Sequence, residues 1–266
     1  MLKNITIGQY FPGNTIIHKL DPRIKILITL IFIIALFFVD SFTPYLFVIA
    51  FIFISIVLSK VPLKYILKGL KPLFIIILIT FFINAILTPG KLIFNIGPIS
   101  ITEEGLRQAT FMALRLVFLV VGTSLLTLTT SPIALTDGIE KLLNPFRKVG
   151  LPAHELAMMM TIALRFIPTL LEETDKIMKA QMARGADFES GNIMNRAKSL
   201  VPLLVPLFIS AFRRADELAM AMEARCYRGG DNRTRMKVLS LEKRDYLSLG
   251  ISLLMFAIII FFRYFI

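Results

Sequence analysis

The sequence has few of the residues that build disulfide-rich, metal-binding or soluble domains. It contains one cysteine, Cys226, so no disulfide can form within the chain, and its two histidines, His18 and His154, complete no Cys/His metal spacing. Tryptophan is absent. Charged residues make up 18% of the chain, whereas soluble domains carry about 25%. These shortages argue against a soluble, disulfide-rich or zinc-binding protein.

Motifs for nucleotide binding and catalysis are also missing. The chain has no G-x-x-x-x-G-K-[ST] sequence, so it has no P-loop with which to bind ATP. Asp137-Gly138 comes closest to an acidic metal site, and no further acidic residue at a helical spacing completes it. No nucleophile, base and orienting group stand in an evident constellation. We therefore expect a protein that is not itself an enzyme and binds no cofactor.

Apolar residues, in contrast, are abundant and occur in long runs. The chain is 56% hydrophobic, with 23 Phe and a mean hydropathy of +0.75. A bilayer-spanning helix needs about 20 mostly apolar residues. Five segments meet or nearly meet this length: 23–39, 43–59, 72–88, 109–130 and 246–265. The second is the weakest and spans only if 41–44 supply its first turn. We predict an all-α membrane protein with about five transmembrane helices.

Polar residues in these segments suggest local roles. Asp21 is a good N-cap for the first helix, and Pro22 suits its first position. Lys25 is expected to extend its ammonium group to the lipid headgroups. Arg115 is expected to reach outward in the same way rather than to bind substrate, and Asn84 to form an interhelical hydrogen bond.

The distribution of basic residues orients the predicted bundle. Basic residues dominate the N-terminal segment and the 60–71 loop, whereas the connection between the first two segments carries Asp40 and no basic residue. By the positive-inside rule, the N-terminus, the 60–71 loop and the 131–245 region are cytoplasmic. Five spans then place the C-terminus outside.

The 131–240 region has a different pattern from the membrane bundle predicted for 1–130 and from the final span in 241–266. Three helical patterns run from Pro132 to near Asn144, from Pro152 to Met182 and from Ile193 to Tyr227. The apolar runs at 156–164 and 200–212 are short and are interrupted or followed by prolines. We interpret the three as cytoplasmic or interfacial coupling helices.

The two long patterns are expected to cross and pack. Ala211, Ala215 and Ala219 recur every four residues, and a stripe of small residues lets two helix backbones approach closely.

Each long pattern closes on a similar triplet, Ala183-Arg184-Gly185 and Ala224-Arg225-Cys226. An arginine in the last turn of a helix can simply satisfy terminal carbonyls and complement the helix dipole, which contributes about 0.3–1 kcal/mol. Alternatively, small neighbours expose the guanidinium group so that it can bind a partner's carboxylate. The residues alone leave both interpretations open.

In this order, the motifs resemble the transmembrane T component of energy-coupling factor (ECF) transporters, a branch of the ABC transporters. The resemblance covers nearly the whole chain. It rests on the two triplets together with His18-Lys19-Leu20-Asp21-Pro22-Arg23-Ile24-Lys25, Arg165-Phe166-Ile167-Pro168 and Met222-Glu223-Ala224-Arg225.

The resemblance implies an energy-coupling subunit of an ATP-driven importer of vitamins, other micronutrients or metal ions in a prokaryotic plasma membrane. Two ABC-type ATPase subunits would carry ATP and Mg²⁺, and a separate membrane subunit would bind and choose the substrate. Membrane lipids are further partners, and nucleic acid is not.

The resemblance also implies residue roles. Arg184 and Arg225 would each anchor one ATPase subunit, with Ala183, Gly185 and Ala224 as small neighbours. Cys226 stands where the family commonly has glycine. Because cysteine adopts a positive φ less readily, we expect that helix end to differ in detail.

Two other functions compete with this interpretation. A self-sufficient secondary transporter would carry its own site near the bilayer midplane, often on broken helices in repeated halves, yet the spans hold few ionisable groups and no evident inverted repeat. A membrane-embedded phosphotransferase acting on lipid precursors would need clustered acidic metal ligands near the interface.

Overall fold

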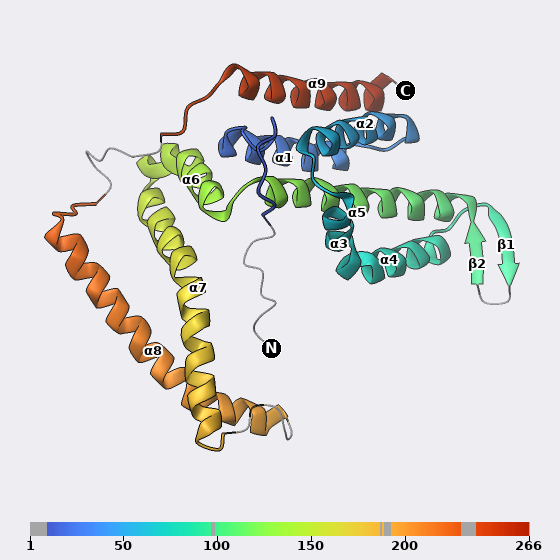
Figure 1. Cartoon of the computed structure of the whole chain (residues 1–266). Helices are drawn as coiled ribbons and strands as arrows, with labels where there is room; N and C mark the ends of the chain where they lie inside the picture. Colours follow the sequence, from blue (N-terminus) through green and yellow to red (C-terminus); the bar gives the residue numbers. More distant parts are fainter. Residues whose placement is uncertain (1–9, 97–98, 187, 189–192, 230–237, 266) are drawn as a thin grey trace. The chain divides into compact units, whose positions relative to one another are not determined.

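The computed structural model describes residues 10–96, 99–186, 188, 193–229 and 238–265, which are mostly helical (Figure 1). A two-stranded antiparallel hairpin between α4 and α5 is the exception within these ranges. The predicted all-α membrane class is confirmed. The elements are α1 (Pro22–Phe37), α2 (Phe42–Ser59), α3 (Leu63–Leu70), η2 (Lys71–Leu73), α4 (Phe74–Leu87), β1 (Leu92–Ile96), β2 (Ile99–Thr102), α5 (Glu103–Thr129), α6 (Pro132–Leu143), η3 (Asn144–Val149), α7 (Ala153–Ala183), α8 (Ile193–Ala224) and α9 (Lys243–Phe265).

The described residues form two compact units. The bundle unit contains those up to Gly138 and from Val238 onward, and the helix-pair unit contains those from Ile139 to Gly229. The first division lies inside α6 rather than after residue 130. Close packing explains this position, because a Cβ atom on Gly138 would lie 3.0 Å from the Cβ of Pro22. The first turns of α6 therefore belong to the bundle unit.

Helix α1 lies at the centre of the bundle unit, where it packs against α5 and α9. Its side chains Phe32, Ala35 and Leu36 are buried together with Val48 of α2 and Ile259 of α9. In a bilayer, such packing stabilises the bundle mainly through van der Waals contact, since lipid tails are as apolar as the side chains they replace.

The start of α1 and the start of α2 follow the sequence prediction. The Asp21 carboxylate accepts a hydrogen bond from the backbone N–H of Arg23 at 2.9 Å, and Pro22 occupies the first helical position. Ser41 is the N-cap of α2, so the second predicted segment gains the extra turn that it needs.

Among the described residues, five helices are long and apolar enough to cross a membrane: Phe42–Ser59, Leu63–Leu87, Glu103–Thr129, Ala153–Ala183 and Lys243–Tyr264. The number of candidate spans matches the prediction, but one of the helices is a different one. Helix α1 has 16 residues and is not among the five. Helix α7 is among them, although its apolar run at 156–164 was not predicted to be a span, because the helix continues through Pro168.

Two predicted side-chain roles are wrong. Lys25 does not reach headgroups: it is only 6% exposed, and its ammonium group donates to the carbonyl oxygens of Thr129 at 2.9 Å and His18 at 3.2 Å. The last carbonyls of α5 lack intrahelical donors, and the ammonium group supplies one. Asn84 makes no interhelical bond through its amide nitrogen, which donates to the carbonyl oxygen of Thr80 within α4 at 2.8 Å.

Arg115 has a specific partner within the bundle unit. Its guanidinium group donates to the carbonyl oxygen of Val39 at 3.0 Å and lies over the ring of Phe37. It therefore holds α5 against the C-terminal end of α1.

Candidate partner-binding helix ends

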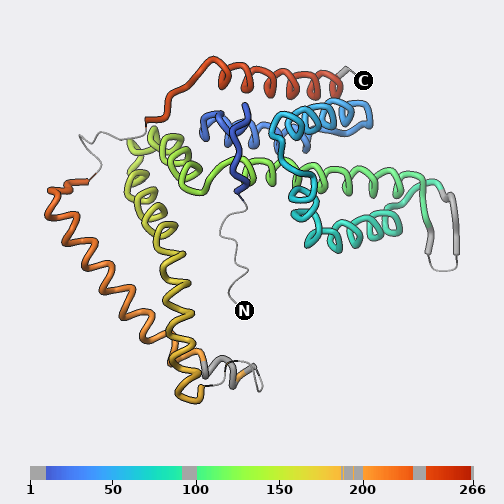
Figure 2. Tube along the Cα trace, viewed as in Figure 1, coloured from blue at the N-terminus to red at the C-terminus, as the bar shows by residue number. Residues whose placement is uncertain are grey.

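The helix-pair unit is dominated by α7 and α8, which run antiparallel (Figures 1 and 2). Contacts along the pair establish this direction: Tyr227 with His154, Arg214 with Glu173, and Gln181 with Pro202. Consequently, the C-terminal ends of the two helices lie at opposite ends of the pair. A 31-residue helix is about 46 Å long at 1.5 Å per residue, so Arg184 and Arg225 are roughly that far apart.

The C-terminal end of α7 is a Schellman motif. Arg184 is the C-cap, and Gly185 follows in the left-handed conformation with φ of 90°. The N–H of Gly185 donates to the carbonyl of Met182, and the N–H of Ala186 donates to the carbonyl of Gln181, both at 3.0 Å. The predicted left-handed glycine is confirmed.

Helix α8 ends in the same motif, although its left-handed residue is a cysteine. Cys226 has φ of 53° and donates its N–H to the carbonyl of Glu223 at 2.8 Å. Tyr227 donates its N–H to the carbonyl of Met222 at 3.0 Å. The expectation that Cys226 changes this end is therefore wrong. The left-handed conformation costs a non-glycine residue about 1–2 kcal/mol, and the two hydrogen bonds that close the helix offset that cost.

Both arginines are exposed and available. All six residues of the two triplets are exposed, and neither guanidinium group forms an ion pair or hydrogen bond with any residue that the structure describes. The terminal carbonyls accept from backbone N–H groups of the Schellman motifs instead. Neither guanidinium group is therefore needed to satisfy these carbonyls.

The arginine at the end of α8 lies beside a polar cluster that the sequence did not indicate. The Tyr227 hydroxyl lies 3.0 Å from the Met158 sulfur and 3.4 Å from His154 Nε2, and His154 Nδ1 lies 3.0 Å from a carboxylate oxygen of Glu140. The cluster ties the residue after Cys226 to the start of α7 and to α6. His154 and Tyr227 are far apart in the sequence, so no local pattern could have paired them.

A second contact joins the middle of the pair. The Glu173 carboxylate on α7 accepts hydrogen bonds from the Ser210 hydroxyl and from the Arg214 guanidinium group, the latter at 2.8 Å, both on α8. This contact restrains α7 and α8 from sliding past each other.

The alanine stripe of α8 faces α7 across an open groove of about 520 Å³. Ala211, Ala215 and Ala219 line it together with Ile162 and Phe166 of α7. Ala215 and Ala219 are exposed, so along this length the stripe leaves space between the two helices.

Among the residues for which the structure gives positions, no group of three or more His, Cys, Asp or Glu side chains could hold a metal ion. Each helix end presents an exposed guanidinium group, which can bind a carboxylate through paired hydrogen bonds.

Comparison with known proteins gives consistent matches along the chain. A family model described as "Cobalt transport protein" (CbiQ) matches residues 13–236, which include both arginine ends. Three similar relatives all carry the name "Energy-coupling factor transporter transmembrane protein EcfT". The one from Thermosediminibacter oceani is 69% identical over 244 residues, 92% of either chain. The one from Clostridium kluyveri is 67% identical over 250 residues, 93% of either chain. The one from Bacillus subtilis is 50% identical over 263 residues, 98% of this chain and 99% of the relative.

Proposed function

The chain belongs to the family of energy-coupling factor transporter transmembrane proteins, and we propose that Arg184 and Arg225 are the points at which it binds two ATPase subunits. It is a multi-pass membrane protein and the energy-coupling transmembrane subunit of such a transporter. Family membership removes the grounds for a self-sufficient secondary transporter or a phosphotransferase.

One observation carries the proposal: two helices end in the same backbone motif, each with an exposed arginine whose guanidinium group forms no ion pair or hydrogen bond with a described residue. Because α7 and α8 are antiparallel, these ends are separated by roughly 40 Å or more. Two acceptors, one for each helix end, fit this geometry, and a carboxylate on each acceptor would match the planar fork of the guanidinium group.

In this proposal, ATP and Mg²⁺ bind to the ATPase subunits, and this chain transmits their motion. Movement of an acceptor displaces the helix end that it holds. The Glu173 contacts with Ser210 and Arg214 make α7 and α8 move together. Helix α6, whose first turns belong to the bundle unit, continues the chain from the helix-pair unit into the membrane region.

A separate membrane subunit would bind the imported vitamin, micronutrient or metal ion. The positive-inside rule supports a cytoplasmic location for the N-terminus, for the basic 60–71 segment and for the ATPase-binding ends, with the C-terminus outside.

The test is the double variant Arg184→Glu with Arg225→Glu, expressed together with the ATPase and substrate-binding subunits. We expect normal insertion into the membrane but no ATPase co-purification and no ATP-driven uptake, because each carboxylate would repel its acceptor. Each single variant should retain one ATPase subunit. Arg213→Glu, an exposed α8 position away from the helix ends, is the matched control. Uptake that persists in the double variant would refute the proposal.

A further inference from the structure

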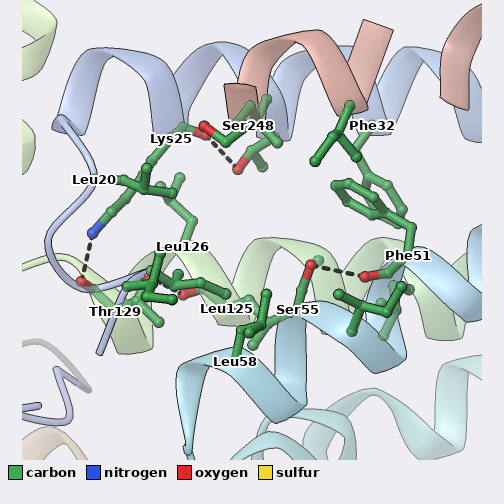
Figure 3. A pocket seen from close by; sticks show the side chains of 18 of the residues that line it. Leu20, Lys25, Phe32, Phe51, Ser55, Leu58, Leu125, Leu126, Thr129 and Ser248 are labelled. Atoms are coloured by element: carbon green, nitrogen blue, oxygen red, sulfur yellow. Dashed lines mark hydrogen bonds between the residues drawn. The ribbon is translucent and has the colours of Figure 1, made fainter. Parts of the chain in front are cut away.

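A cavity of about 300 Å³ lies inside the bundle unit, among α1, α2, α5, α9 and the turn that precedes α1. Figure 3 shows Lys25 and Thr129 at one end of it and Phe32 and Phe51 at the other. Small-molecule sites in proteins range from about 300 to 1,000 Å³. The cavity is therefore large enough to accept a slender molecule or part of a larger one.

The side chains around this cavity select for an apolar occupant. Its walls are mainly aliphatic and aromatic, and their hydroxyl groups are already used. Each hydroxyl donates to a carbonyl oxygen of its own helix: Ser55 to Phe51, Thr29 to Lys25, Thr129 to Leu125 and Ser248 to Asp245. A polar group placed inside would find few hydrogen-bond partners, and burying it there would be unfavourable. A hydrocarbon chain needs no hydrogen-bond partner and would therefore lose nothing there.

Basic side chains line one end of the cavity. Arg244, in the first turn of α9, lines the cavity, and its Nε atom is buried without a hydrogen-bond partner among the described residues. Arg244 precedes Asp245, whose carboxylate accepts a hydrogen bond from the backbone N–H of Asp21. This contact places Arg244 at the Lys25 end of the cavity.

The nearby carboxylates leave this charge incompletely matched. Asp21 is paired with Arg23 at 2.7 Å, and Asp245 accepts from two backbone N–H groups. Glu242 contacts Arg244 at 3.0 Å but is itself 55% exposed, and exposed ion pairs contribute little. A further anion beside Arg244 would give its guanidinium group a partner that these carboxylates do not fully supply.

We propose that this cavity binds an anionic phospholipid, with one acyl chain inside the bundle and the phosphate beside Arg244. The terminal methyl group of the chain lies toward Phe32 and Phe51, the end away from the charges. The position suits this ligand, because Leu58 lines the cavity just before the basic 60–71 segment, which the positive-inside rule places on the cytoplasmic side. Basic pockets between transmembrane helices on that side favour anionic headgroups. The site is separate from both arginine ends and does not depend on ATPase binding.

The experiment uses the full chain in phosphatidylcholine vesicles that contain a trace of phosphatidylglycerol with a photoreactive group on its acyl chain. After irradiation, we expect the labelled peptides to come from 25–32, 51–58, 122–129 and 244–251, with labelling competed by unlabelled phosphatidylglycerol. The same photoreactive chain on phosphatidylcholine should label about fivefold less, the factor expected from one basic residue near an anionic headgroup. Equal labelling by the two lipids, or labelling spread evenly over the lipid-facing helices, would overturn the proposal.

Substitutions locate the site. Ser55→Phe on α2 and Leu126→Phe on α5 each fill the cavity and should abolish the labelling that unlabelled phosphatidylglycerol competes. Val57→Phe, on α2 but outside the cavity, should leave this labelling in place. Arg244→Gln should lower labelling by phosphatidylglycerol about fivefold, and Arg263→Gln, near the other end of α9, should leave it unchanged. If a filling variant does not fold, the competition measured with the unsubstituted chain still decides. Full labelling in both folded filling variants would also overturn the proposal.

Discussion

The ammonium nitrogen of Lys25 lies 2.9 Å from the carbonyl oxygen of Thr129, so the first turn of α1 is bonded to the last turn of α5. The two residues are 104 positions apart in the chain. The same ammonium group also donates to the carbonyl oxygen of His18. One buried cation thus joins the turn before α1, α1 itself and the end of the longest bundle helix.

Lys25→Met should lower the stability of the bundle unit. Methionine preserves most of the side-chain volume but leaves two carbonyl oxygens without their donor, at a cost of about 1–3 kcal/mol for each buried group. The thermal unfolding temperature in detergent measures the effect. Lys19→Met, at an exposed position in the same segment, controls for the loss of charge. A Lys25→Met variant that unfolds at the same temperature as the Lys19→Met variant would contradict this role.

The left-handed residues at the two helix ends should respond oppositely to substitution. Gly185→Ala should destabilise the end of α7 by about 1–2 kcal/mol, because alanine is unfavourable at a positive φ. The cause is backbone strain alone, since an added Cβ at Gly185 would meet no atom within 4 Å. Cys226→Gly should relieve strain and leave ATPase co-purification intact. Unfolding temperatures and co-purified ATPase test both parts; loss of ATPase in Cys226→Gly would show that the cysteine itself contributes to binding.

Tyr227→Phe should weaken the binding of only one ATPase subunit, the one held by Arg225. The lost hydroxyl contacts His154 and Met158, and one hydrogen bond contributes about 0.5–1.5 kcal/mol, equivalent to a roughly two- to tenfold change in binding. In the Arg184→Glu background, where binding depends on the Arg225 end, Tyr227→Phe should reduce ATPase co-purification by this factor. In the Arg225→Glu background it should have no effect. Equal losses in both backgrounds would indicate general unfolding of the helix pair.

Acid should destabilise the segment before α1. Burial lowers the pKa of His18, and the Lys25 charge adds to this, which together outweigh the opposing hydrogen bond to the Phe11 carbonyl. The folded state therefore favours neutral imidazole, while the unfolded state takes up the proton near the ordinary pKa of about 6.5. Stability should be full above that pH and fall as the pH drops through it. Unfolding temperatures measured across this range should decline less in His18→Gln; identical profiles would contradict the role of His18.

Sequence patterns predicted the helix ends better than the long-range contacts. The Gly185 turn was predictable because a glycine after the last turn of a helix is a local signal. The conformation of Cys226 was not, because its intrinsic preference opposes a positive φ and only the two closing hydrogen bonds outweigh it. The burial of Lys25 depends on Thr129 of another helix, which composition and periodicity do not reveal. The continuity of α7 through Pro168 agrees with the helical pattern predicted from Pro152 to Met182, although proline is ordinarily a helix breaker.

At the candidate site, too, the sequence predicted individual residues but not the contacts between distant ones. Arg184 and Arg225 could be singled out from repeated local triplets, but the antiparallel direction of their helices comes from contacts such as Glu173 with Arg214. The cluster of Tyr227, His154 and Glu140 gives no sequence signal, because each residue taken alone resembles an ordinary surface residue.

The bundle unit is assembled from two stretches of chain separated by the helix-pair unit, and this order affects synthesis. The carboxylate of Asp245 accepts a hydrogen bond from the backbone N–H of Asp21, 224 residues earlier. A ribosome therefore translates the whole helix-pair unit before α9 can cover α1 and close the bundle. Until then, the face of α1 that packs on Met255 and Ile259 has no protein neighbour from α9. Chains that terminate before α9 would carry both arginine ends but an incomplete bundle unit.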